Sequence, residues 1–139
     1  MKKAKKCVIM LLTVAMVIGS MSVVMAGSDT GTLYVTPSCT AYCDVWCDGN
    51  FSTASTHLYV DRSYDSVSAS ASITVTGGRE LNYRVLGTDS VTETSISDLR
   101  VLADAEANYT EVPYKAVSSH SASVGLSSRG PLSLEAMFD

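Results

Sequence analysis

The segment that most constrains this chain is residues 66–76, where apolar and hydroxyl side chains alternate without a break. Every odd-numbered residue there is Val, Ala or Ile, and every even-numbered residue is Ser or Thr. Successive side chains of a β-strand point to opposite faces, so the pattern predicts a strand with one face in a core and one in water. The residues expected to point inward are Val67, Ala69, Ala71, Ile73 and Val75.

Other segments show the same alternation, with turn residues between them. They are residues 32–36, 56–61, 79–87, 99–109 and 114–126. Gly77-Gly78 predicts a tight turn, and residues 79–87 are expected to complete a hairpin with Leu81, Tyr83 and Val85 facing inward. This spacing predicts an all-β fold, a single antiparallel β-sandwich or small barrel domain of about six to eight strands.

One of these strands has a helical alternative. Ser97-Asp98 could cap a short helix, because Leu99, Leu102 and Ala103 follow at helical spacing. We favour a strand because the alternation continues as far as Tyr109.

The N-terminal residues have the form of a secretory signal peptide. Four lysines among the first six residues precede an uncharged apolar run over residues 7–18, and Val24-Met25-Ala26 supplies small residues at a cleavage position. The alternative is an uncleaved membrane anchor, since residues 7–26 carry no charge. We predict a signal peptide, with its helix, over residues 1–26 and a secreted β-sandwich-like domain over residues 27–139.

The composition of the 113-residue mature chain limits its partners. Cleavage removes four of ten basic residues and none of the fourteen acidic ones, which leaves a net charge of −8. Binding to nucleic acid or to anionic lipid needs clustered Lys or Arg, so we expect neither partner, and no membrane after cleavage. Ser and Thr make up 31 of the 113 residues, and such a hydroxyl-rich polar face suits a sheet outside the cell.

The three cysteines of the mature chain are the candidate site residues. Cys39, Cys43 and Cys47 are four residues apart, a spacing that fits one face of either a strand or a helix. We favour a strand, because Thr, Val, Tyr and Trp residues between them prefer strands. Residues four apart on a strand are roughly 13 Å apart, whereas a disulfide needs Cα atoms within about 7 Å.

Three states remain open for these thiols. They could be buried and unpaired, they could include a disulfide, or they could bind zinc together with His57. The odd count also allows an intermolecular disulfide between chains.

No catalytic set is visible in the remaining sequence. His57 is expected in water and His120 in a hydrogen-bonded structural position, while Asp104 and Glu106 alternate with alanines on an exposed face. The chain has no G-x-S-x-G elbow, phosphate-binding loop or EF-hand. We therefore predict no catalytic, cofactor-binding or metal-binding residue.

Residues 120–124, His-Ser-Ala-Ser-Val, resemble a short stretch in the lactococcin-972 type of secreted bacteriocin, a small β-sandwich. The cysteines and the length depart from that pattern, so the resemblance supplies only an alternative. Our first hypothesis is a secreted, non-enzymatic extracellular binding or structural domain with an unknown partner. The alternative is a bacteriocin-like or toxin-like protein, and a third hypothesis is a hydrolase of unrecognised type.

Overall fold

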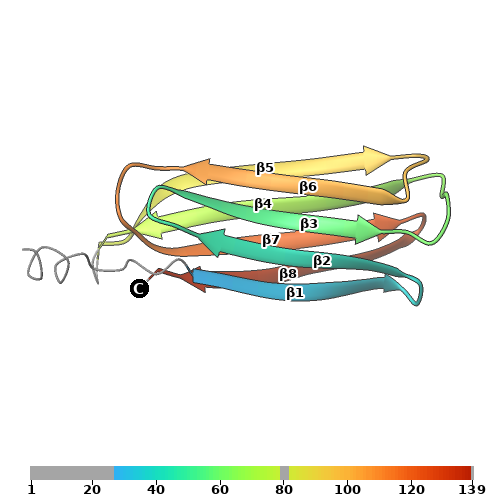
Figure 1. Cartoon of the computed structure of the whole chain (residues 1–139), viewed down its shortest axis with the longest axis horizontal. Helices are drawn as coiled ribbons and strands as arrows, with labels where there is room; N and C mark the ends of the chain where they lie inside the picture. Colours follow the sequence, from blue (N-terminus) through green and yellow to red (C-terminus); the bar gives the residue numbers. More distant parts are fainter. Residues whose placement is uncertain (1–26, 79–81, 139) are drawn as a thin grey trace, which may run out of the picture.

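The chain folds into two packed antiparallel sheets. The computed structural model describes residues 27–78 and 82–138, in which every regular element is a strand (Figure 1). The predicted antiparallel β-sandwich is therefore confirmed, while the predicted signal helix lies outside the described residues. The eight strands are β1 (Gly27–Thr36), β2 (Cys39–Cys47), β3 (Phe51–Tyr59), β4 (Val67–Gly77), β5 (Arg84–Ser95), β6 (Arg100–Asn108), β7 (Pro113–Val124) and β8 (Ser127–Met137).

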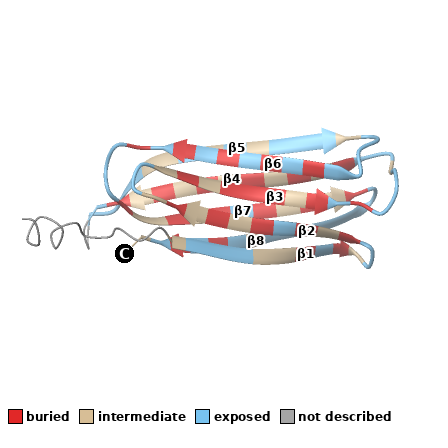
Figure 2. Cartoon of the chain, in the orientation of Figure 1, coloured by how far each residue is buried: buried red, intermediate tan, exposed pale blue. Residues whose placement is uncertain are grey.

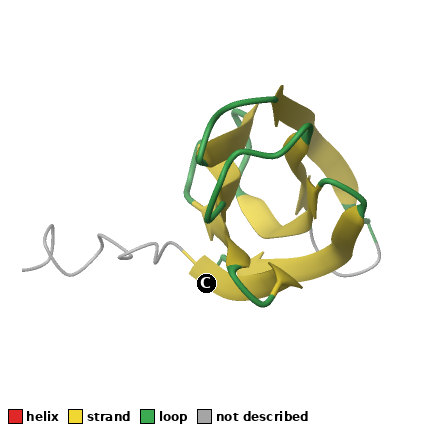
Figure 3. Ribbon diagram, turned by 90° about the vertical axis from the view of Figure 1, so that its right-hand side faces the viewer, coloured by secondary structure: helices red, strands yellow, loops and turns green. Residues whose placement is uncertain are grey.

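Each sheet has four strands. Sheet A has the order β1-β2-β3-β6, and sheet B has the order β5-β4-β7-β8. The chain crosses between the sheets after β3, β5 and β6, so neighbours in a sheet are often distant in sequence. The edge strands of the two sheets face one another, β1 beside β8 and β5 beside β6, and the end-on view in Figure 3 shows the strands arranged around a ring.

The core lies between the sheets and is built mostly of small side chains. Along β4 the five residues predicted to point inward are at most 1% exposed, and burial alternates along the strand (Figure 2). The facing strand β6 buries Val101, Ala103, Ala105 and Ala107 and exposes the residues between them, so the strand prediction for this segment is confirmed.

Two aspartates close the seams between the sheets. Asp29 of β1 accepts a hydrogen bond of 3.2 Å from the backbone N–H of Glu135 on β8. Asp89 of β5 likewise accepts one of 2.9 Å from the backbone N–H of Glu106 on β6. Both aspartates pair with inward-facing residues of the adjacent strand, Val45 and Ile73, so their side chains lie on the core side of the edge strands.

Glycines let the seam strands approach closely. A Cβ atom added to Gly27 would lie 1.8 Å from the carbonyl oxygen of Met137, and one added to Gly87 would lie 3.2 Å from the Cβ of Ala107. A side chain at Gly27 would thus force β1 away from β8.

The prediction for the hairpin after Gly78 is wrong in one respect. Tyr83 and Val85 are 49% and 57% exposed instead of buried, and Leu81 lies outside the described residues. The cause is a bulge: Val75 pairs with Gly87 but Thr76 pairs with Val85, so Leu86 is an extra residue. A bulge shifts the alternation by one residue, which moves Val85 to the outer face beside Thr76.

Candidate functional site

The three cysteines lie on the inner face of β2. All are buried, and all are free thiols. β2 is a strand, as predicted, so thiols four residues apart are separated by roughly 13 Å along it. Within residues 27–78 and 82–138, no group of three His, Cys, Asp or Glu side chains is arranged to hold a metal ion.

Each of the two outer thiols contacts a polar group. Cys39 Sγ donates to Asp61 Oδ1 at 3.2 Å, and the hydroxyl of Tyr64 donates to the same carboxylate oxygen at 2.8 Å. These two hydrogen bonds lower the pKa of the Asp61 carboxyl to about 2, and the bond from Tyr64 has the larger effect. Cys47 Sγ lies 3.8 Å from the hydroxyl of Tyr109.

The middle thiol adjoins a polar cluster at the centre of the core. Burial raises the pKa of the Cys43 thiol to about 11, so it stays protonated and unreactive at neutral pH. Its neighbour Thr56 donates a hydrogen bond of 2.8 Å to the carbonyl of Ser70. Thr56 Oγ1 also lies 2.9 Å from His120 Nδ1.

These contacts define the tautomer of His120. Because Thr56 donates its hydroxyl hydrogen to the Ser70 carbonyl, Thr56 Oγ1 accepts a hydrogen bond from Nδ1–H of His120. His120 Nε2, 2.7 Å from Ser118 Oγ, then accepts from that hydroxyl. Burial lowers the pKa of His120 to about 4, so the ring is neutral at physiological pH.

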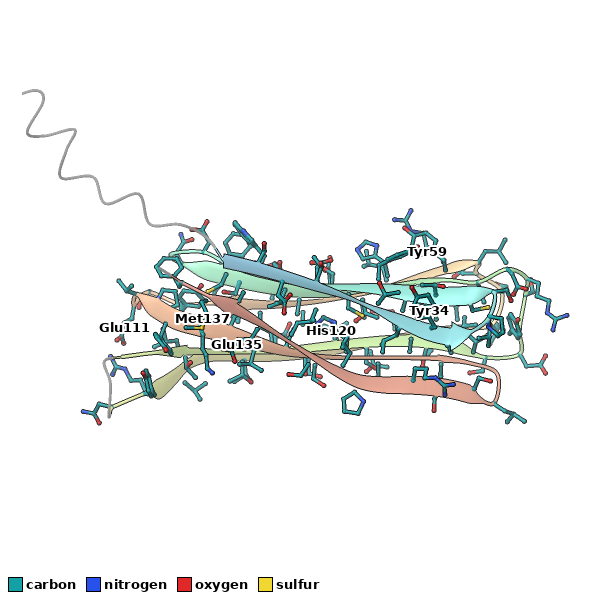
Figure 4. All side chains as sticks on the ribbon, turned by 90° about the horizontal axis from the view of Figure 1, so that it is seen from below. Tyr34, Tyr59, Glu111, His120, Glu135 and Met137 are labelled. Carbon is teal, nitrogen blue, oxygen red and sulfur yellow. The ribbon has the colours of Figure 1, made fainter. Side chains whose placement is uncertain are left out.

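The Ser118–His120 pair resembles a nucleophile and its base, but its location differs from that of a catalytic pair. Ser118 is 1% exposed and His120 is completely buried, and Figure 4 shows His120 between the two sheets. The hydrogen bonds of this histidine go to the hydroxyls of Thr56 and Ser118. The structure thus shows His120 buried and hydrogen-bonded, and its structural role stays a prediction.

A different cluster of side chains is accessible on the outside of sheet A. We call it the aromatic face, and it consists of Tyr42, Asp44, Trp46, Phe51, Ser55, His57, Tyr59, Arg100 and Asp104. These residues come from β2, β3 and β6, and each alternates with inward-facing residues of its strand.

Two pairs of aromatic rings occupy this face. The rings of Tyr42 and Tyr59 meet edge to face with centroids 5.8 Å apart, and those of Trp46 and Phe51 do so at 5.0 Å. Tyr42 is 55% exposed and Tyr59 41%, and Figure 4 shows Tyr59 projecting away from the sandwich. Since Tyr42 and Trp46 are four residues apart on β2, the two pairs are roughly 13 Å apart.

Carboxylates lie between the two aromatic pairs. Asp44, Ser55 and Asp104 are in register across three strands, and Ser55 donates a hydrogen bond to Asp104. Partial burial is the main reason that the pKa of Asp44 is raised. The electrostatic interaction with His57 lowers this pKa, and the interaction with Asp104 raises it further. The outward-facing side chains of β2 are therefore, in order, the ring of Tyr42, the half-buried carboxylate of Asp44 and the ring of Trp46.

The outer face of sheet B is chemically different. Its central rows consist of hydroxyl side chains that bond to one another, such as Ser68 to Ser123 at 2.7 Å and Ser70 to Thr92 at 2.8 Å. The hydroxyls of this face are Ser68, Ser70, Ser72, Thr74, Thr76, Thr88, Ser90, Thr92, Thr94, Ser119, Ser121 and Ser123. These central hydroxyl rows thus provide an internal reference surface for the aromatic face of sheet A.

Open grooves lie elsewhere on the part of the sandwich that the structure describes. One, of about 350 Å³, includes Arg84, Asn108 and Glu111, and an ion pair joins Arg84 to Glu111 across it. Another, of about 460 Å³, includes Tyr34 and Arg129. Neither groove contains a thiol or His120.

Comparison with known proteins supplies no family for this chain. No protein-family model, curated protein or solved structure matches it. In the part of the chain that the structure describes, no helix has the length and apolar character needed to cross a membrane.

The sequence analysis identified the cysteines but not the aromatic face. The available signal was the strand prediction for residues 39–47, which places Tyr42, Asp44 and Trp46 together on the face opposite the thiols. The contributions of Phe51, Tyr59 and Asp104 depend on strand pairing, which the sequence did not specify.

Proposed function

We propose that this protein is a secreted, non-enzymatic binding domain and that the aromatic face is its binding surface. The observation that carries the proposal is the set of exposed and partly exposed aromatic rings on either side of Asp44 and Asp104, on the outside of sheet A. Exposed Tyr and Trp side chains give up little conformational entropy on binding and bury a large area, which is why they concentrate at recognition surfaces.

The contrast between the two sheets supports this assignment. Solubility alone accounts for the central rows of sheet B, where β4 presents only Ser and Thr side chains to the outside. Solubility does not account for Tyr42 and Tyr59, whose rings remain in water at 55% and 41% exposure. A partner that covers these rings would remove that apolar surface from water.

The sequence supports export as the setting for this function. The signal-peptide pattern ends at Ala26, with small residues at the cleavage position. The excess of acidic residues in the mature chain further favours a partner that is not anionic.

The test compares matched variants of the two faces. Labelled mature protein, residues 27–139, is incubated with the cell-envelope and matrix fractions of the producing organism, and the retained fraction is measured. The double variant Tyr42→Ala/Tyr59→Ala should lose most of the retention, whereas Ser70→Ala/Thr92→Ala should keep it. Circular dichroism checks that both variants fold, and equal retention of the two folded variants overturns the proposal.

A further inference from the structure

We infer that the ligand of the aromatic face is a neutral polysaccharide chain, which lies along β2 from Tyr42 to Trp46. This inference rests on the proposed function, because it names the partner of the same surface. It follows from three properties of the face: the spacing of its rings, the balance of its hydrogen-bonding groups, and the position of its arginine.

The spacing of the rings fits a ligand that is chemically repetitive along its length. Two aromatic pairs are roughly 13 Å apart on a nearly straight strand, with polar groups between them. A pyranose ring has an apolar C–H face, which stacks on an aromatic ring, and a rim of hydroxyls. A chain of such rings therefore presents apolar faces and hydroxyls again and again, in the same alternation as Tyr42, Asp44 and Trp46.

The polar groups of the face suit hydroxyls, which both donate and accept hydrogen bonds. Asp44 and Asp104 accept, while His57 and Arg100 supply N–H donors on the same surface. Asp44 is partly buried and its pKa is raised, so it lacks part of its hydration and gains from a hydroxyl donor. A ligand with only hydrogen-bond donors, or only acceptors, would pair with half of these side chains.

The carboxylates would attract a cationic ligand, but one ring of the face is already paired with a cation of the protein. The guanidinium of Arg100 already lies over the ring of Tyr59, 5.2 Å from its centroid. The most favourable cation–π position on that ring is therefore taken by the protein itself. An anionic ligand would meet Asp44 and Asp104 directly and be repelled.

The first experiment identifies the chemistry of the partner in the envelope fraction used above. The fraction is treated either with periodate, which cleaves vicinal diols of sugars, or with protease, and retention of the mature protein is measured again. Loss of retention after periodate but not after protease is expected. Loss after protease alone overturns the inference and leaves the proposed function standing.

The second experiment uses pure probes: cellulose and xylan, whose vicinal diols periodate cleaves, and polylysine-coated beads. Among these probes, we expect the native protein to bind a polysaccharide. Tyr42→Ala and Trp46→Ala should each weaken its affinity for that polysaccharide roughly tenfold, the loss expected for one well-packed aromatic contact. Tyr42→Trp should keep binding because it keeps the stacking surface, and Ser70→Ala on sheet B serves as the matched control.

Salt separates the remaining alternatives. Binding to a neutral polysaccharide should be unchanged when sodium chloride rises from about 0.05 M to about 0.5 M, because no net charge is paired. Binding only to polylysine, lost at the higher salt, overturns the inference. Envelope retention that is insensitive to Tyr42→Ala/Tyr59→Ala overturns the proposed function, so the two failures are distinguishable.

Discussion

Thr56 on β3 and His120 on β7 join the two sheets through a hydrogen bond of 2.9 Å between Thr56 Oγ1 and His120 Nδ1. Around it, polar groups satisfy one another at a site that is closed to water, since both residues are completely buried. A buried polar group with all its partners costs little, but the same group with a net charge costs a great deal. The protonation state of His120 therefore affects the stability of the whole sandwich.

We predict that the protein loses stability as pH falls from about 6.5 to about 4. The pKa of His120 is lowered from 6.5 to about 4 in the folded state. Between these values the unfolded chain binds a proton that the folded chain does not, so acid favours unfolding. The full effect is about 3 kcal/mol, and thermal unfolding measured across this pH range should show it.

The variant His120→Gln is the control for that prediction. It removes the titrating group, so its melting temperature should be lower than that of the native protein at pH 7 but nearly constant between pH 6.5 and pH 4. The depressed pKa of Asp61 acts in a separate window, since its contribution is lost only as pH falls from 3.8 towards 2. A native protein with a flat profile above pH 4 would contradict the assignment to His120.

Neighbouring substitutions on β4 should differ sharply in their effect. Ile73 is 1% exposed and faces sheet A, so Ile73→Asp buries an unpaired charge and should cost several kcal/mol of a total stability of ~5–15 kcal/mol. Ser72 lies on the outer face, and Ser72→Asp should cost less than about 1 kcal/mol. Equal melting temperatures for the two variants would disprove the orientation of β4.

The three thiols should be inaccessible in the folded protein and free when it unfolds. We expect iodoacetamide to leave Cys39, Cys43 and Cys47 unmodified under native conditions, because all three are buried. In concentrated guanidinium chloride without any reductant, all three should react, and intact mass spectrometry counts the adducts. Fewer than three adducts before reduction would reveal a disulfide and contradict the structure.

The exported protein should begin at Gly27. The motif Val24-Met25-Ala26 ends the uncharged N-terminal run and supplies small residues at the cleavage position. Intact mass spectrometry of protein from the culture medium measures the start directly. A mass that includes residues 1–26 would contradict the predicted cleavage and favour the uncleaved anchor.

The parts of the fold that the sequence predicted well are central strands with regular alternation. β4 and β7 are central in sheet B, and their inward residues, including Ile73 and His120, are buried as the pattern indicated. β2 is also central, and strand propensity decided correctly against a helix for its three cysteines. A central strand has a paired strand on each side, one face against the core and one face in water, so its burial follows the period of two closely.

The alternation of apolar and polar residues did not predict the edge strands or which strands pair with each other. β5 lies at an edge, is mostly exposed, and loses its alternation at the bulge beside Leu86. β8, also at an edge, was not predicted as a strand at all. The aromatic face shares this limit, because Tyr42 and Tyr59 come together only through the pairing of β2 with β3.

The seams held by Asp29 and Asp89 bear on how this protein behaves at high concentration. An open sheet edge is a template on which strands of other copies add, and fibrils grow in that way. Here each of the four edge strands faces another edge strand, and a carboxylate on the core side of β1 and of β5 occupies a backbone N–H that an incoming strand would need. The two aspartates thus give this sandwich its own protection against polymerisation.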